Sequence, residues 1–332
     1  MDLMIDVGAK ARTLEEASMR KARFLLTLVG VALGVLGTGN LAAQLAPAEN
    51  GVPARMVVTE EARQGSNAPV IDLADVIVYQ GDERDKVTGW VPALGDHAGL
   101  EFFILLDDGS TSSLGTQLED IRQFINAQPS SAKIGIAYMR NGMALIAQKP
   151  TSDHSLAAKA LRLPMGLAGA NGSPYFSLSD LIKHWPKSDS RREVLMVSNG
   201  VDSYYDGNDL LDPYLASTIE KAQRAGVVVS VIYTPGVGQV GGGDWRTYLG
   251  QVYMAQVAEK TGGESYYIGF NRPAVSFAPY LRDLANRLNH QYLLSFLAEP
   301  EKKSGLQPVK LGTEVSNADL VSAERVYVPA ER

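Results

Sequence analysis

Residues 107–113 bring two carboxylates and four hydroxyls together between an apolar run and a helical pattern. They read Asp-Asp-Gly-Ser-Thr-Ser-Ser and follow the run 100–106, which is apolar apart from Glu101 and is typical of a buried strand in a parallel sheet. Open α/β sheets bind their ligands at the carboxyl ends of such strands. Oxygen ligands alone suit a hard cation such as Mg²⁺, which keeps several waters. The spacing therefore predicts a divalent cation site whose open position an acidic group of a partner could fill.

The elements that must position this site alternate along the chain from residue 99 onward. Apolar strand-length runs separated by helical patterns indicate crossover connections and a mostly parallel sheet. The only antiparallel neighbours expected are 133–139 and 143–148, on either side of the short polar turn 140–142. The other strands are expected at 100–106, 193–198, 227–233 and 265–268, and the helices at 114–127, 153–163, 179–185, 213–225, 248–261 and 279–289.

The polar group after the first strand resembles the metal-ion-dependent adhesion site of the von Willebrand factor A domain, which begins Asp-x-Ser-x-Ser. Residues 108–112 fit that pattern literally, with Asp108, Ser110 and Ser112 at its three fixed positions. Counted from the end of the apolar run, Asp107 is the more natural first aspartate, and this register places Gly109 where the family has Ser. Both registers remain open from the sequence.

The resemblance implies two further ligands. Ser173 lies where the family has a Thr before a helix, and Asn199 in Ser198-Asn199-Gly200 lies where the family has an Asp. Asn removes one negative charge, so we expect weak or degenerate binding of Mg²⁺ or another divalent cation. The implied metal site is Asp107, Asp108, Ser110, Ser112, Ser173 and Asn199.

The resemblance covers residues 98–297 and implies a doubly wound, mostly parallel six-stranded sheet with one antiparallel edge strand. Residues 44–69 are expected to be a linker with at most a weak edge strand near 56–59, and 70–97 to be a β-rich flank. Strands within 291–328, including the β tail 298–332, could pair with that flank as a small accessory module. Both flanks resemble those of bacterial secreted proteins that carry this domain.

The N-terminal segment has the order of a secretory signal. Basic residues at 20–23 precede the uncharged apolar run 24–36, and small residues follow up to Ala43, after which we expect cleavage. A retained membrane anchor is the alternative, because no charge occurs from 24 to 48. Translation could also begin at Met19. Either way the rest of the chain is predicted to be exported: periplasmic, secreted or anchored in the envelope, with membrane contact only through an uncleaved segment.

Composition excludes several classes of protein. The 332 residues contain no cysteine, which excludes disulfide scaffolds, thiolate zinc sites and cysteine nucleophiles. Lys and Arg number 31 against 37 Asp and Glu, a formal charge of −6. There is no basic excess to neutralise phosphates, so we expect no nucleic-acid partner.

Enzyme patterns are weak throughout. Residues 236–241 satisfy Gly-x-Gly-x-x-Gly, but Pro235 precedes them and the helix begins late, which favours a flexible loop over a nucleotide site. Residues 202–209 superficially resemble a calcium loop but lack its terminal Glu, and we predict a polar rim loop. The four histidines are isolated, and no paired acid and base is evident for a hydrolase.

The sequence therefore predicts an exported, non-enzymatic protein-binding or adhesion-type module with a degenerate metal site and an unknown protein ligand that could offer a carboxylate. The alternative is a metal-independent interaction or scaffold protein that uses the loops 202–209 and 236–246 directly. An exported hydrolase or a nucleotide-binding enzyme is less favoured. Aromatic residues that could anchor an interface are Trp185, Tyr204, Tyr205, Trp245, Tyr266 and Tyr267, of which Tyr266 and Tyr267 are expected to be partly in the core.

Overall fold

The computed structural model describes residues 51–65, 68–110, 112–165, 172–205, 212–236, 245–266, 276–299 and 303–330, all within one compact unit, Leu45–Arg332. The predicted signal segment 1–43 lies outside these residues. Among the described residues, no helix combines the length and the apolar character needed to cross a membrane.

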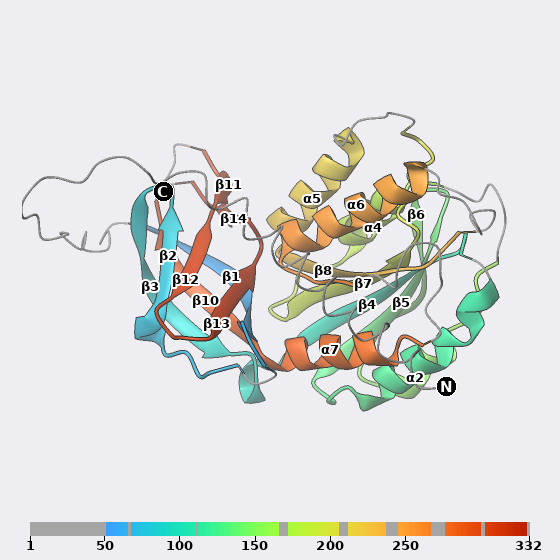
Figure 1. Cartoon of the computed structure of the whole chain (residues 1–332), viewed down its shortest axis with the longest axis horizontal. Helices are drawn as coiled ribbons and strands as arrows, with labels where there is room; N and C mark the ends of the chain where they lie inside the picture. Colours follow the sequence, from blue (N-terminus) through green and yellow to red (C-terminus); the bar gives the residue numbers. More distant parts are fainter. Residues whose placement is uncertain are drawn as a thin grey trace, which may run out of the picture. The chain divides into compact units, whose positions relative to one another are not determined.

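A six-stranded sheet forms the centre of the α/β domain, in the order β6-β5-β4-β7-β8-β9. Neighbouring strands are parallel except β5 and β6, which pair antiparallel at one edge. This confirms the predicted doubly wound, mostly parallel sheet (Figure 1). The strands are β4 Leu100–Asp107, β5 Ala132–Arg140, β6 Met143–Thr151, β7 Arg191–Ser198, β8 Val227–Tyr233 and β9 Ser265–Tyr266.

Helices cover both faces of this sheet (Figure 1). Because successive strand side chains point to opposite faces, Ile104 of β4 packs toward α2, α3 and α7, and Leu105 packs toward α4, α5 and α6. The first set comprises α2 Gln117–Ala127, α3 His154–Lys159 and α7 Ala278–Asn289, and the second comprises α4 Pro174–His184, α5 Pro213–Ala225 and α6 Trp245–Thr261. Short 3-10 turns occupy η1 Leu73–Asp75, η2 Gly95–His97 and η3 Ser112–Gly115.

Several helix boundaries differ from the sequence prediction. Helix α2 begins at Gln117 rather than 114, and α6 begins at Trp245 rather than 248. Helix α4 begins at Pro174 rather than 179, because Ser173 caps it and proline is favoured in the first helical turn. Helix α3 ends at Lys159 rather than 163. Its start is as expected, with the Asp153 carboxylate accepting the backbone N–H of Ser155 at 3.0 Å and of Leu156 at 3.3 Å.

Both flanks build an accessory β module, as predicted. One antiparallel sheet has the order β12-β2-β3-β10-β1-β13, and β11 pairs with β14 separately. Val58 of β1 and Phe296 of β10 lie in the apolar core of this module, with Val326 of β14. The strands are β1 Val52–Ala62, β2 Val76–Gln80, β3 Glu83–Pro92, β10 Gln291–Ala298, β11 Gly305–Pro308, β12 Lys310–Thr313, β13 Ala318–Ser322 and β14 Arg325–Val328.

Two predicted boundaries are wrong. The expected linker 44–69 contains β1, an 11-residue strand that lies between β10 and β13 rather than at an edge. Charged residues such as Arg55, Glu60 and Glu61 hide its apolar alternation in the sequence. Strand β10 belongs to the accessory sheet, so the α/β domain ends at α7 rather than at residue 297.

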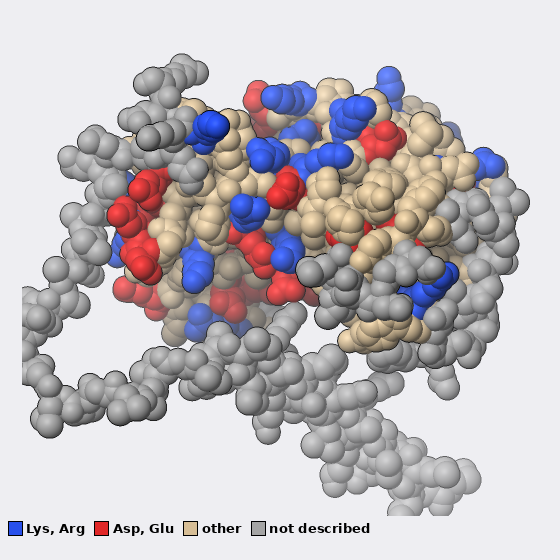
Figure 2. Space-filling view, turned by 90° about the horizontal axis from the view of Figure 1, so that it is seen from above, with Lys and Arg blue, Asp and Glu red and all other residues tan. Residues whose placement is uncertain are grey.

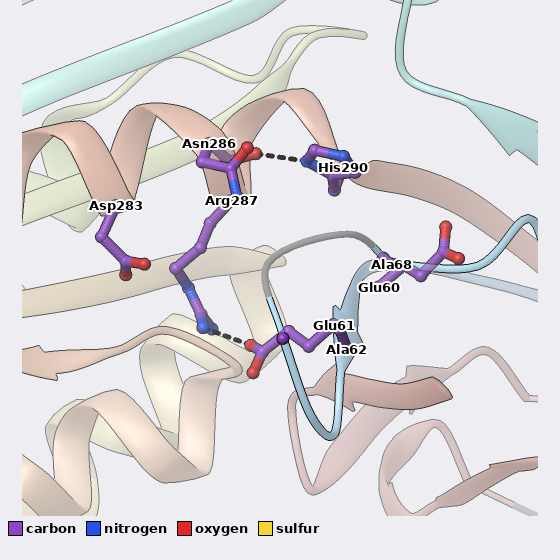
Figure 3. Close-up of a pocket in the computed structure, with 9 residues that line it drawn as sticks. Glu60, Glu61, Ala62, Ala68, Asp283, Asn286, Arg287 and His290 are labelled. Atoms are coloured by element: carbon purple, nitrogen blue, oxygen red, sulfur yellow. Dashed lines mark hydrogen bonds and ion pairs between the residues drawn. The ribbon is translucent and has the colours of Figure 1, made fainter. Parts of the chain in front are cut away.

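Helix α7 and β1 meet around Arg287, whose guanidinium pairs with Glu61 (Figure 3). It also lies 3.1 Å from Glu264. The backbone N–H of Glu60 donates to the carbonyl of His290 at 2.9 Å. A hollow of about 300 Å³ lies beside these groups. Burial raises the pKa of Glu61, and Arg287 partly opposes this. The accessory sheet is therefore held to the α/β domain by charged contacts as well as by the chain itself.

Replacing Val58 tests whether β1 is an integral strand. Val58 is fully buried and pairs with Tyr292 on one side and Ser322 on the other. Val58→Asp is expected to lower the free energy of unfolding by about 3 kcal/mol or more, because it buries an unpaired carboxylate. Arg55→Asp, at an exposed position of the same strand, is expected to change it by less than about 1 kcal/mol. Urea denaturation of the two variants measures the difference, and equal small effects would mean that β1 does not contribute to the fold.

Candidate functional site

The predicted site lies where β4 and β7 end and α4 begins. Asp107 is the last residue of β4, Ser198 is the last of β7, and Ser173 caps α4. The parallel pairing of β4 with β7 brings their carboxyl ends to the same edge of the sheet. We call this edge, with the turns that follow its strands, the rim.

Asp107 faces the turn after β7. One carboxylate oxygen, Oδ2, accepts a hydrogen bond from the Ser198 hydroxyl at 2.7 Å, and Oδ1 accepts the backbone N–H of Gly109 at 2.8 Å. Burial is the largest influence on this carboxyl and raises its pKa, whereas the Ser198 and Gly109 hydrogen bonds lower it. Asp107 thus lies at the end of β4, and Gly109, two residues later, belongs to the same turn.

Asp108 is separated from this group. Its carboxylate is 1% exposed and accepts two hydrogen bonds from the Arg162 guanidinium, at 2.6 and 2.8 Å. It also accepts the backbone N–H of Met165 at 3.3 Å. The literal Asp-x-Ser-x-Ser register would place Asp108 in the cation site. The structure instead pairs it with an internal cation, because neighbouring residues at a strand end point to opposite sides.

The serines of the predicted site behave differently from one another. Ser110 is fully buried, forms a backbone bridge with Gly236, and its hydroxyl has no hydrogen-bond partner among the described residues. The side chain of Ser112 lies outside what the structure describes, as does Thr111. Ser173 accepts the backbone N–H of Phe176 at 3.2 Å and donates its hydroxyl to Asp202.

Asp202 is a site residue that the sequence prediction assigned to a polar rim loop. It is buried, accepts the Ser173 hydroxyl, and accepts the backbone N–H of Tyr204 at 2.7 Å. Asn199 uses its side-chain oxygen locally, accepting the backbone N–H of Val201 at 2.8 Å. An Asp often bonds to the backbone N–H two residues later in a turn. This tendency could have predicted the turn at Asp202 from the sequence, but not its contact with Ser173. Residues 206–211 of the same loop lie outside the described residues.

As arranged, the oxygen atoms of these residues do not fit a divalent cation as a set of ligands. Both oxygens of Asp107 and those of Asp108 already accept hydrogen bonds, and Ser173 and Asn199 are also engaged. In the part of the chain that the structure describes, no three His, Cys, Asp or Glu side chains form a group able to hold a metal. Mg²⁺ requires a near-octahedral shell of oxygens. A cation at the rim therefore stays a prediction, for which the unpartnered hydroxyl of Ser110 is the main structural support.

Partly or largely exposed aromatic residues lie beside these buried polar groups. The Phe176 ring lies 5.6 Å from that of Tyr204 and 4.7 Å from that of Tyr214 between centroids. Tyr204 is 54% exposed and Tyr214 38%. The turn between β5 and β6 adjoins them, since a side chain at Gly142 would come within 3.3 Å of Phe176. We call Phe176, Tyr204 and Tyr214 the aromatic cluster.

A second aromatic pair lies where α6 begins, with Trp245 and Tyr248 stacked at 5.3 Å between centroids. Of the predicted interface anchors, Tyr204 and Trp245 are exposed. Trp185 is not an anchor, because it is buried edge-on against Phe103. Tyr266 is buried, as expected, and Tyr267 lies outside the described residues, as do residues 237–244 of the glycine-rich loop.

Lys and Arg side chains gather on the face seen from the side of α5 and α6 (Figure 2). Ion pairs interrupt this face: Lys260 lies 3.6 Å from Glu324, and Arg325 lies 3.7 Å from Glu220. Such exposed pairs contribute little to stability. The whole chain has a formal charge of −6, and acidic residues are interspersed on this face. We therefore keep the expectation that the partner is not nucleic acid.

No protein-family model and no curated protein matches this sequence. Among solved structures, the chain is similar to an aerotolerance-related membrane protein from Bacteroides fragilis, with 14% identity, a TM-score of 0.43, and coverage of 57% of this chain and 99% of that one. It is also similar to the conserved hypothetical protein BatB from Bacteroides thetaiotaomicron, with 14% identity, a TM-score of 0.42, and coverage of 57% and 97%. It is similar as well to the ArnB paralog VWA2 from Sulfolobus acidocaldarius, with 10% identity, a TM-score of 0.38, and coverage of 84% of this chain and 76% of that one.

Similarity this low does not by itself define the domain, so strand order and direction are the stronger criterion. The order β6-β5-β4-β7-β8-β9, the single antiparallel edge strand and the helices on both faces are those expected of the family. The α/β domain therefore has a von Willebrand factor A-like fold.

The Asp107 carboxyl gives this site a characteristic dependence of stability on pH. Burial raises its pKa in the folded protein, so the neutral form is favoured and stability is lost as pH rises through the folded pKa. Asp107→Asn keeps a neutral side chain at all pH values. We expect the variant to be more stable than wild type at pH 8 by about 1 kcal/mol, and this advantage to shrink toward pH 4.

Urea denaturation at pH 4 and pH 8 measures this difference. Asp108→Asn is the matched control, and it should be less stable than wild type at pH 8 because it weakens the pairing with Arg162. An Asp107→Asn variant less stable than wild type at pH 8 would contradict the account of the buried carboxyl.

Proposed function

We propose that the chain is an exported, non-enzymatic module that binds another protein through the rim of its von Willebrand factor A-like domain. The observation that carries this proposal is the aromatic cluster, exposed beside polar groups that are already hydrogen-bonded within the chain. Tyr and Trp are enriched at the centres of protein interfaces, since they bury large apolar areas and keep a polar tip. Export is supported by the order of residues 20–43.

The state of the rim carboxylates supports a role other than catalysis. A general base must be free to take a proton from a substrate. Asp107 is hydrogen-bonded to Ser198 and Gly109, and Asp108 is paired with Arg162. His154 is not near these carboxylates. Its ring contacts the carbonyl of Ala132, at the end of β5 opposite the rim.

Two versions of this function differ in whether a divalent cation takes part. In the metal-dependent version, a partner carboxylate completes the shell of a cation held at Asp107, Ser110 and their neighbours. In the metal-independent version, the partner contacts the aromatic cluster and the neighbouring loops directly. The hydrogen bonds that already engage Asp107, Ser173 and Asn199 favour the second version.

Site-specific photo-crosslinking in the envelope of the native organism tests the proposal. A photoreactive phenylalanine analogue replaces Tyr204 at the rim or, as control, Lys187, which is exposed just before β7 at the opposite end of the sheet. We expect a discrete protein adduct from position 204 and none from 187. Tyr214→Ala combined with the probe at 204 should lower the yield at least about fivefold, because one neighbouring interface aromatic is lost.

Mass spectrometry of the recovered chain also reads its N-terminus, which we expect at Gln44. Repeating the irradiation in EDTA separates the two versions: an unchanged adduct supports direct contact, and a lost adduct supports the metal-dependent one. Equal labelling from positions 204 and 187 would contradict a binding site at the rim.

A further inference from the structure

Arg162 is a cation in direct contact with the rim carboxylate Asp108, and its position is fixed on several sides. Two of its nitrogens donate to the two oxygens of Asp108, at 2.6 and 2.8 Å. This bidentate arrangement is the strongest form of Arg–carboxylate contact, because both hydrogen bonds are charge-assisted. The Asp108 carboxylate is almost completely buried, whereas the Arg162 side chain is 37% exposed. The pair therefore places a partly exposed guanidinium over a buried carboxylate at the rim.

The ring of Tyr138 holds the guanidinium from a second direction. The central carbon of that group lies 3.7 Å from the ring centroid, a favourable cation–π distance. The Tyr138 hydroxyl accepts the backbone N–H of Arg162 at 2.6 Å and lies 3.3 Å from the carbonyl of Ala160. Burial raises the pKa of Tyr138, so its hydroxyl stays protonated. Arg162 is thus held in place by the domain core before any partner binds.

We propose that Arg162 is a built-in cation that replaces a divalent metal ion at the rim. Its guanidinium neutralises Asp108 permanently, so the rim needs no Mg²⁺ or Mn²⁺ to be ready for a partner. The inference deepens the proposed function by assigning the source of positive charge at the same edge. It concerns the chain alone, so it can fail or succeed whether or not a partner is found.

The charges at the rim determine what would follow from the loss of Arg162. Asp107 and Asp108 are consecutive, and among the residues that the structure describes only Asp108 has a cationic partner, Arg162. A divalent ion at Asp108 would have to displace two charge-assisted hydrogen bonds and the Met165 N–H. Without the guanidinium, the buried Asp108 carboxylate would lose its cationic partner, and the hydroxyl of Ser110, two residues later, has no hydrogen-bond partner among the described residues. Such a set of oxygens attracts a hard cation.

Thermal unfolding of the full chain in 1 mM EDTA or 5 mM MnCl₂ tests the proposal without any partner. The Tm of wild type should be the same in EDTA as in MnCl₂. The same should hold for Arg162→Lys, which keeps the positive charge. Arg162→Gln should gain a Tm rise of about 4 °C or more in MnCl₂, the size expected when an ion binds only the folded state. The double variant Arg162→Gln/Asp108→Asn should lose that rise.

Two results would overturn the proposal. One is an Arg162→Gln variant that folds but shows no MnCl₂-dependent rise. The other is a rise in wild type that Asp107→Asn or Asp108→Asn abolishes, which would show that a metal already binds at the rim. The second comparison uses only wild type and the two Asp variants, so it decides the question even if Arg162→Gln fails to fold. Its expected outcome is no MnCl₂-dependent change in wild type.

Discussion

Consecutive side chains at the end of a β-strand point to opposite sides of the sheet, and this constraint separates Asp107 from Asp108. Asp107 turns toward the end of β7 and bonds to Ser198, whereas Asp108 turns toward Arg162. One carboxylate is satisfied by neutral donors and the other by a guanidinium. Asp108 also accepts the backbone N–H of Met165, and Asp107 that of Gly109, so both carboxylates hold backbone at the rim.

The buried hydrogen bonds of the rim leave its aromatic residues to face solvent. Ser173 joins the start of α4 to Asp202 in the turn after β7. This contact holds Phe176 of α4 beside Tyr204. A buried hydroxyl–carboxylate contact is costly to break, because each group would lose its partner without regaining water. The geometry of the exposed cluster therefore depends on polar contacts beneath it.

The fold class could be predicted because its signal is local. Runs such as 100–106 and 227–233, each apolar except for one residue, identify buried strands without reference to any other part of the chain. Strand β1 could not be predicted well, since its burial of Thr59 and Glu60 depends on β10 and β13, more than 200 residues later. The accessory module exists only when the two ends of the chain meet.

The candidate site was predictable in place but not in contacts. The polar run 107–113 after an apolar strand locates the rim, and the structure places Asp107, Ser110, Ser173 and Asn199 there. Nothing in the sequence links Asp108 to Arg162, 54 positions later, or Ser173 to Asp202. These pairings join the turn after β4 to the segment after α3, and the start of α4 to the turn after β7, contacts that residue spacing does not encode. They decide whether the oxygens are free for a metal.

A crystal structure of the protein soaked in MnCl₂, with an anomalous difference map at the rim, tests the central claim most directly. The account predicts the Arg162 guanidinium against Asp108 and no manganese peak beside Asp107, Asp108 or Ser110. A strong peak bound by these oxygens, with Arg162 displaced, would contradict it.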